Sequence, residues 1–90
     1  DVKNDYLKYD IVSWTNSIQK TLNFKYNSVN NDISKISLID IQGRLIYSNS
    51  INPNSTIISG EINTSSFKTG IYILKVEQGN LKLFKKFILD

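Results

Sequence analysis

The sequence predicts an all-β protein, and three observations lead to this prediction. Fourteen of the 90 residues are Ile, which favours strands, and Ala, the strongest helix former, is absent. Short runs of alternating apolar and polar residues recur along the chain, as in strands that bury one face. Turn-forming residues separate these runs at fairly regular spacing. The expected fold is an immunoglobulin-like antiparallel β-sandwich of about seven short strands.

The N-terminal stretch is the least defined part of the chain. Residues 6–14 fit either a strand or the end of a linker, and a short helix over residues 16–22 lacks the apolar spacing of helices. We therefore divide the chain into residues 1–19, a linker or a variant first strand, and residues 20–90, the sandwich itself. Because the chain carries no signal peptide and begins at Asp1, we expect it to be part of a longer protein.

Six further strands are expected in order along the chain. The first alternates clearly, with Leu22, Phe24 and Tyr26 pointing one way. In the second, Ile36 and Leu38 share one face while apolar residues also occupy the other, which is typical of a central strand. The six strands cover residues 20–28, 34–41, 44–50, 55–62, 71–77 and 81–89. The expected turns lie at residues 30–32, 42–43, 52–54, 68–70 and 78–80, where Gly, Asn or Pro accumulates.

Charge and composition exclude several classes of function. The net charge is +3, but ten of the eleven basic residues are Lys. Since Arg is the usual residue for bidentate contacts to bases and phosphates, the single Arg44 argues against a nucleic-acid reader. There is no Cys for a disulfide framework, and no apolar run is long enough to span a membrane as a helix.

Catalytic chemistry is not expected. Without His or Cys, the chain has neither the usual general base near neutral pH nor the best nucleophile. Its carboxylates are scattered, and Asp40 is expected to be a turn residue beside a strand. The sequence has no cluster of oxygen ligands for a metal and no Gly-rich loop for a phosphate, so we expect no metal, no cofactor and no enzymatic activity.

The aromatic residues allow a second interpretation of the function. Aromatic faces stack on sugars in carbohydrate-binding sandwiches, and five side chains could form such a platform: Tyr6, Tyr9, Trp14, Tyr47 and Tyr72. Alternatively, the tyrosines of the expected strands are ordinary core or edge residues.

The last expected strand is strongly basic. Lys82 and Lys86 fall on one face and Lys85 on the other. Lysines on an edge strand prevent unwanted strand addition, but an exposed basic edge can also be read by a partner. The residues alone leave both interpretations open.

Three motifs in order resemble a known family. The segment from Ile36 to Ile46, with Asp40, Gly43 and Arg44, resembles the "I-Y-D-hydrophobic-x-G-R/K-hydrophobic" motif of type IX secretion C-terminal sorting domains, type A, also called Por secretion tails. The segment Phe67 to Val76, with Gly70 and Tyr72, is similar to that family's "L-x-x-G-hydrophobic-Y" motif. The chain then ends on a strand similar to the family's terminal "K-K-hydrophobic-hydrophobic" strand, here Lys85, Lys86 and Phe87. Two features differ from the family. The family often opens with a Pro-Asn-Pro element, but residues 12–20 contain no proline, and Ile39 replaces the aromatic residue that usually precedes the motif's Asp.

The resemblance implies that the domain is an address for secretion and not an enzyme. Such domains are carried by secreted proteins of Bacteroidetes-type bacteria, which reach the periplasm by an ordinary export signal. The outer-membrane type IX machinery then recognises the domain, and a sortase-like peptidase commonly removes it as the cargo is released or attached to the cell surface. Carried over by position, the expected recognition residues are Asp40, Gly43, Arg44, Gly70, Tyr72, Lys85, Lys86 and Phe87. The alternative that the residues leave open is an immunoglobulin-like carbohydrate-binding or adhesive module.

Overall fold

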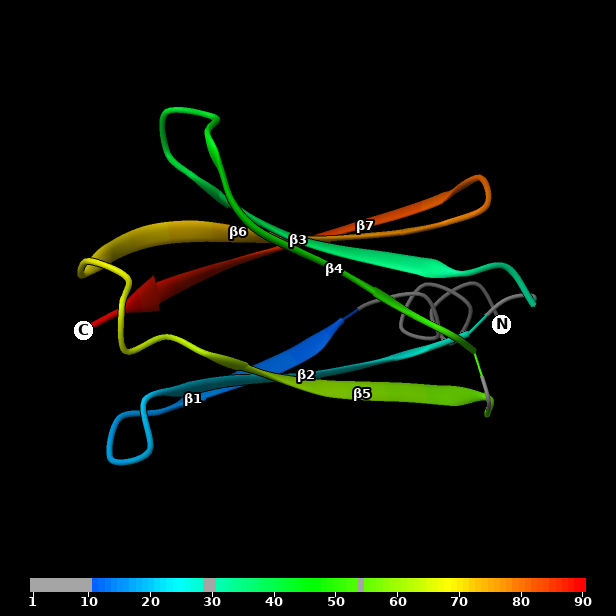
Figure 1. Cartoon of the computed structure of the whole chain (residues 1–90), viewed down its shortest axis with the longest axis horizontal. Helices are drawn as coiled ribbons and strands as arrows, with labels where there is room; N and C mark the ends of the chain where they lie inside the picture. Colours follow the sequence, from blue (N-terminus) through cyan, green and yellow to red (C-terminus); the bar gives the residue numbers. More distant parts are fainter. Residues whose placement is uncertain (1–10, 29–30, 54) are drawn as a thin grey trace, which may run out of the picture.

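Seven β-strands make up the regular structure of the described residues. The computed structural model describes residues 11–28, 31–53 and 55–90. The strands are β1 Val12–Asn16, β2 Thr21–Asn27, β3 Ser34–Asp40, β4 Leu45–Ile51, β5 Ile57–Asn63, β6 Gly70–Gln78 and β7 Leu81–Leu89 (Figure 1). No helix long and apolar enough to cross a membrane occurs in this part of the chain.

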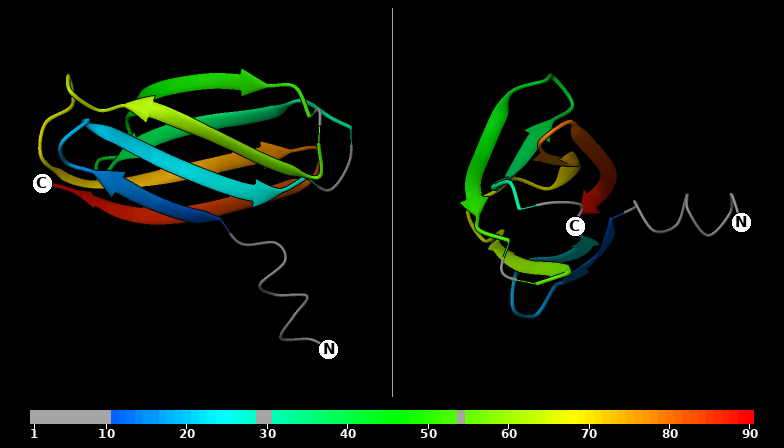
Figure 2. Two further views of the ribbon diagram at one scale, coloured as in Figure 1. Left: turned by 90° about the horizontal axis from the view of Figure 1, so that it is seen from below. Right: turned by 90° about the vertical axis from the view of Figure 1, so that its right-hand side faces the viewer.

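The strands form two antiparallel sheets that face each other as layers (Figures 1 and 2). One sheet has the order β1-β2-β5 and the other the order β4-β3-β6-β7. The chain passes from one layer to the other after β2, β4 and β5, whereas β1–β2, β3–β4 and β6–β7 pair within a sheet. This arrangement confirms the predicted immunoglobulin-like sandwich and makes β4 and β7 the edge strands of the larger sheet.

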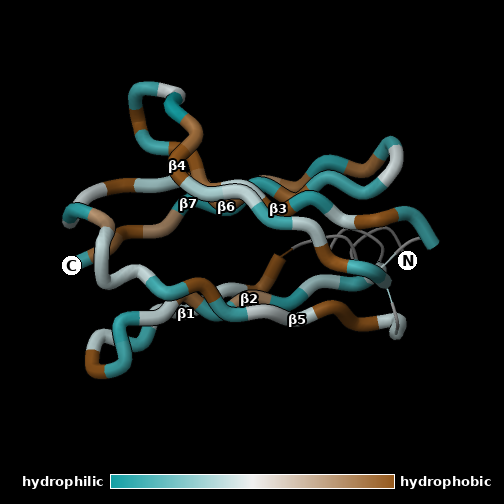
Figure 3. Tube along the Cα trace, viewed as in Figure 1, coloured by the Kyte–Doolittle hydropathy of each residue, from teal (hydrophilic) through white to brown (hydrophobic). Residues whose placement is uncertain are grey.

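The core lies between the two sheets and follows the alternation of the sequence. Residues at every second position of β2, β3 and β6 are buried, and the residues between them point outward; Figure 3 shows hydrophobic and hydrophilic residues alternating along the strands. The buried apolar cluster draws on both sheets and consists of Ile11, Leu22, Phe24, Tyr26, Ile36, Leu38, Ile58, Ile62, Tyr72, Leu74, Val76 and Phe87. The predicted central strand is β3, which pairs with β4 on one side and β6 on the other.

The N-terminal region resolves into a strand. Val12–Asn16 pairs with β2, so these residues form a strand. The alternative of a helix over residues 16–22 is wrong, because Asn16 Oδ1 accepts hydrogen bonds from the backbone N–H groups of Ile18 and Gln19, both at 3.0 Å, and closes a turn. Residues 1–10 lie outside the described residues, as do parts of the expected turns at 30–32 and 52–54.

The buried side-chain amide of Gln78, a residue predicted only as part of a turn, joins distant parts of the fold. Gln78 is fully buried at the end of β6. Its Nε2 donates hydrogen bonds to Ser28 Oγ at 2.9 Å and to the Asp32 carbonyl oxygen at 3.0 Å. Because a buried amide without partners is costly, these contacts stabilise the connection between β2 and β3 against the last hairpin.

Candidate functional site

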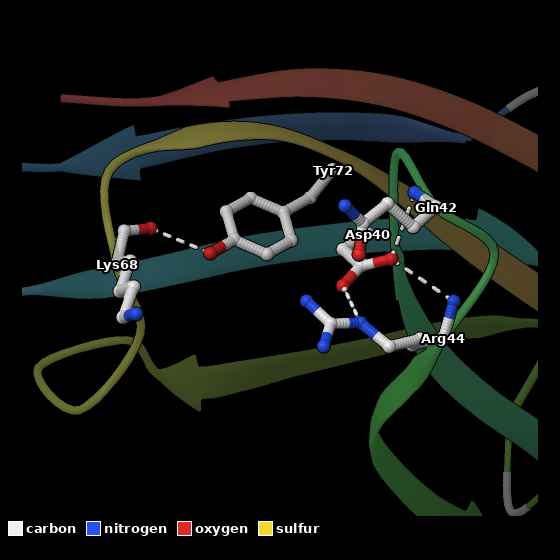
Figure 4. Close-up of polar contacts among 5 residues, drawn as sticks. All are labelled: Asp40, Gln42, Arg44, Lys68 and Tyr72. Carbon is white, nitrogen blue, oxygen red and sulfur yellow. Dashed lines mark hydrogen bonds and ion pairs between the residues drawn. The ribbon is translucent and has the colours of Figure 1, made fainter.

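The first motif builds a tight turn between β3 and β4. Asp40 Oδ1 accepts hydrogen bonds from the backbone N–H groups of Gln42 and Arg44, both at 2.9 Å, while its Oδ2 accepts one from Arg44 Nε at 2.8 Å (Figure 4). The backbone closes the same turn, since the N–H of Gly43 donates to the Asp40 carbonyl oxygen at 3.0 Å. The motif residues Asp40, Gly43 and Arg44 therefore act together as one turn.

The charge of Asp40 is stabilised by this turn. The pKa of its carboxyl group is lowered, chiefly by the hydrogen bond from the Arg44 backbone N–H, with smaller contributions from the Arg44 side chain and the Gln42 N–H. The Arg44 side chain remains 73% exposed beside it. Such a carboxylate holds its turn in shape, as expected for Asp40.

Gly43 supplies the backbone conformation that the turn needs. Its φ is +83°, in the left-handed region that favours glycine, and an added Cβ would have open space around it. The constraint at this position is therefore the backbone angle and not the packing.

The second motif places an aromatic side chain in the core. Tyr72 is buried, its ring stacks on Phe87 with centroids 5.6 Å apart, and it also contacts Phe67 at 6.4 Å. Its hydroxyl donates a hydrogen bond to the Lys68 carbonyl oxygen at 2.5 Å, which ties the loop before β6 to the strand (Figure 4). Gly70 begins β6 with φ +150° and pairs with Leu89 of β7.

The three motifs meet in one cross-strand row. Asp40 at the end of β3 pairs with Tyr72 of β6, and Tyr72 pairs with Phe87 of β7. Positions 40, 72 and 87, which are well separated along the chain, are thus brought to the same end of the four-stranded sheet. The order of motifs along the chain corresponds to one structural unit in the fold.

A comparison with protein families identifies this unit. The family model described as "Secretion system C-terminal sorting domain" matches residues 14–90, which include all three motifs and all seven strands except the first residues of β1. The chain belongs to this family. No curated protein matches the chain.

Membership in this family confirms the resemblance that the three motifs indicated, and it shows the general function of the domain. The sorting domain is a signal for type IX secretion, and it belongs with a cargo protein that this machinery exports to the cell surface or the medium. The match begins at Trp14, so the family region includes most of β1 and starts before residue 20.

The terminal motif of the sorting domain divides between the two faces of β7. Phe87 is buried against Tyr72, whereas Lys86 is exposed on the outer face beside Ile73. Lys85 lies on the opposite, core-facing side and is half-buried, as the alternation predicted. β7 pairs only with β6 among the described residues, so its lysines lie on an edge strand, as expected.

The three described residues of the expected aromatic platform, Trp14, Tyr47 and Tyr72, do not lie together. Tyr72 belongs to the core, Tyr47 packs partly against it from β4, and Trp14 lies on the other sheet with 50% of its surface exposed. Tyr6 and Tyr9 lie outside the described residues. In the part of the chain that the structure describes, no group of three His, Cys, Asp or Glu side chains could hold a metal ion.

Proposed function

We propose that this domain directs its cargo from the periplasm across the outer membrane through direct protein–protein contact with the type IX machinery. The cargo enters the periplasm by an ordinary export signal carried elsewhere in the protein. The sorting domain is then recognised while folded and is removed by a sortase-like peptidase, and it performs no chemistry of its own.

The cross-strand row of Asp40, Tyr72 and Phe87 is the observation that supports recognition of a folded domain. Asp40 shapes a turn, and Tyr72 and Phe87 are buried, so these three residues lie together only in the folded domain. A partner that recognises this arrangement must therefore bind the folded domain. What they share in the fold is one end of the four-stranded sheet, beside the edge strand β7. Among the described residues β7 pairs only with β6, so its outer edge, with Lys82 and Lys86 outward, offers a partner both main-chain groups and charge.

Removing the last strand tests the need for this signal. We expect that a full-length cargo lacking residues 81–90 accumulates in the periplasm of a type IX bacterium, while the intact cargo reaches the medium or the cell surface. Because this deletion also removes Phe87 from the core, Lys82→Glu/Lys86→Glu serves as a second variant that leaves the buried residues in place. Normal export of the cargo lacking residues 81–90 would contradict the proposal.

A carbohydrate-binding function is the second candidate, and one row of residues favours it. Trp14 pairs with Asn23, and Asn23 pairs with Glu61, so an indole, an amide and a carboxylate lie side by side on the outer face of the three-stranded sheet. These are groups that stack on sugar rings and hydrogen-bond their hydroxyls. Glycan-array binding that is lost in Trp14→Ala would support this function, and an array without any bound glycan would rule it out for the glycans printed.

A further inference from the structure

The outer face of the four-stranded sheet carries an apolar patch. Ile39 pairs with Leu45 of β4 on one side and with Ile73 of β6 on the other, and Ile71 pairs with Ile88 of β7. Directly paired side chains lie on the same face of a sheet, so these five residues form one surface, here called the outer-sheet patch. Ile88 is 59% exposed, Leu45 is 58% exposed and Ile71 is 40% exposed.

Solvent-facing sheet surfaces normally carry polar residues in an antiparallel sandwich. The inward positions of the same strands already fill the core, as Leu38, Tyr72 and Leu74 do. The outer-sheet patch therefore adds aliphatic side chains that the core of the isolated domain does not use. Contiguous exposed apolar surface of this kind marks interaction sites.

Basic residues continue the same face beyond the patch. Outward positions hold Lys35 on β3, Lys75 on β6, and Lys82 and Lys86 on β7, against the single carboxylate Glu77. Glu77 already contacts Lys75, whose Nζ is 3.4 Å from Glu77 Oε1 and 5.9 Å from the centre of the Phe84 ring. Glu77 is also the direct cross-strand partner of Lys82 and of Lys35, but four lysines outnumber this one carboxylate, so the face presents positive charge beside its apolar end.

We propose that the outer-sheet patch docks on an acidic protein surface of the type IX machinery, one that carries apolar side chains flanked by Asp or Glu. This proposal rests on the sorting function proposed above and assigns the contact to this face of the sheet. The apolar residues supply the buried area, and Lys82 and Lys86 select an acidic partner by charge complementarity. The motif residues Asp40, Tyr72 and Phe87 act from beneath, since they hold the strands that present the patch.

Charge argues against a second copy of the chain as the occupant. Two such faces packed together across a two-fold axis would bring the lysines of both copies into one interface, and like charges there are unfavourable. The whole chain is also basic, with a net charge of +3, which favours an acidic partner.

Apolar-to-charged substitutions test the patch in the full-length cargo. Leu45→Glu and Ile88→Glu alter exposed side chains of the patch, while Val12→Glu and Ile57→Glu alter side chains of matched exposure, 53% and 55%, on the other sheet. We expect each patch variant to lower the exported fraction by about tenfold or more, as loss of a central interface residue does, and each control to be exported normally. Protease resistance of the sorting domain in cell extracts checks that all four variants remain folded.

Charge reversal tests the chemistry of the partner. Lys82→Glu/Lys86→Glu should reduce export more than Lys82→Gln/Lys86→Gln, whereas Lys25→Glu/Lys68→Glu, which changes the net charge equally elsewhere, should have little effect. Equal effects at the two places would show that net charge and not this face matters, and would overturn the proposal.

Two outcomes distinguish this proposal from the sorting function itself. In the first, the cargo lacking residues 81–90 is retained while the folded patch variants reach an exported fraction within about twofold of that of the unchanged cargo. In that case the proposed role of the outer-sheet patch is wrong and the sorting function stands. If the truncated cargo is exported normally, the sorting function fails. A dimer that Leu45→Glu dissociates, or binding to phosphatidylglycerol vesicles that the same substitution abolishes, would assign the patch to another occupant and overturn the proposal.

Discussion

Asp40 and Tyr72 are direct cross-strand partners, one shaping a turn and the other filling the core. The pairing joins the first two motifs of the family at the end of β3 and β6. Tyr72 then stacks on Phe87 of the terminal motif, so each motif depends on the others for its place. A family signature that is scattered along the chain therefore describes one local arrangement.

The Tyr72 hydroxyl is expected to contribute measurably to stability. Tyr72→Phe retains the stacked ring but removes the hydrogen bond to the Lys68 carbonyl oxygen, and this should lower the free energy of unfolding by about 1 kcal/mol. Tyr72→Ala also removes the ring contacts and should cost about 3–5 kcal/mol. Urea unfolding of the chain measures both values. Tyr47→Phe, at a half-buried tyrosine of β4, is the matched control, and an equal loss there would contradict the role of the Tyr72 bond.

The Asp40 turn makes stability depend on pH. The pKa of Asp40 is lower in the folded chain than its ordinary value of 3.8, so ionised Asp40 stabilises the fold above that pH. This stabilisation is lost as the pH falls through the folded-state pKa. We expect Asp40→Asn to be less stable than the unchanged chain at neutral pH, with the difference shrinking in acid.

Thermal unfolding between neutral and strongly acidic pH checks this expectation. Arg44→Gln is the informative control, because it keeps the backbone N–H of residue 44, which is the main cause of the lowered pKa of Asp40. It should retain most of the pH dependence that Asp40→Asn loses. Parallel pH profiles for Asp40→Asn and the unchanged chain would show that the turn does not stabilise the charge.

Gly43 should tolerate asparagine better than alanine. At φ +83° an L-residue with a Cβ is strained, which costs about 1–2 kcal/mol for Ala, while Asn adopts this conformation more readily. Because an added Cβ has open space around it, steric clashes do not add to this cost. Chemical denaturation of Gly43→Ala, Gly43→Asn and the neighbouring control Gln42→Ala measures the order. Equal stability of all three variants would be inconsistent with a backbone constraint at Gly43.

Gln78 is expected to be a stabilising buried amide. Gln78→Leu keeps much of the side-chain volume but leaves Ser28 Oγ and the Asp32 carbonyl oxygen without the two hydrogen bonds from Nε2. The free energy of unfolding should fall by about 1–3 kcal/mol. The exposed Gln19→Leu is the control and should change stability by less than about 0.5 kcal/mol. An unchanged free energy of unfolding in Gln78→Leu would show that water replaces the hydrogen bonds lost by Ser28 and Asp32.

Much of the fold was accessible from local pattern. Alternation placed β2 within one residue at each end, and the Gln42-Gly43 turn correctly joined β3 to β4. The opposite faces of Lys85 and Lys86 also followed from strand geometry alone. These features depend only on neighbours along the chain, which is why the sequence predicted them.

Long-range relationships were not accessible in the same way. Nothing near Gln78 in the sequence indicates that its amide reaches Ser28, because that contact depends on how the two sheets close. The first strand was ambiguous, since Val12–Asn16 is short and finds its partner only through the turn after Asn16. The outer-sheet patch was equally hidden, because its aliphatic residues look like core residues until the register assigns them to the outer face.

The domain should be sufficient as an export signal, and its transfer to a foreign protein tests this sufficiency. Residues 1–90 are fused to the C-terminus of a reporter that carries its own periplasmic export signal, in a bacterium with a type IX system. We predict that the reporter reaches the medium or the cell surface, while the same reporter without the domain stays in the periplasm. Equal retention of both reporters in the periplasm would contradict the claim.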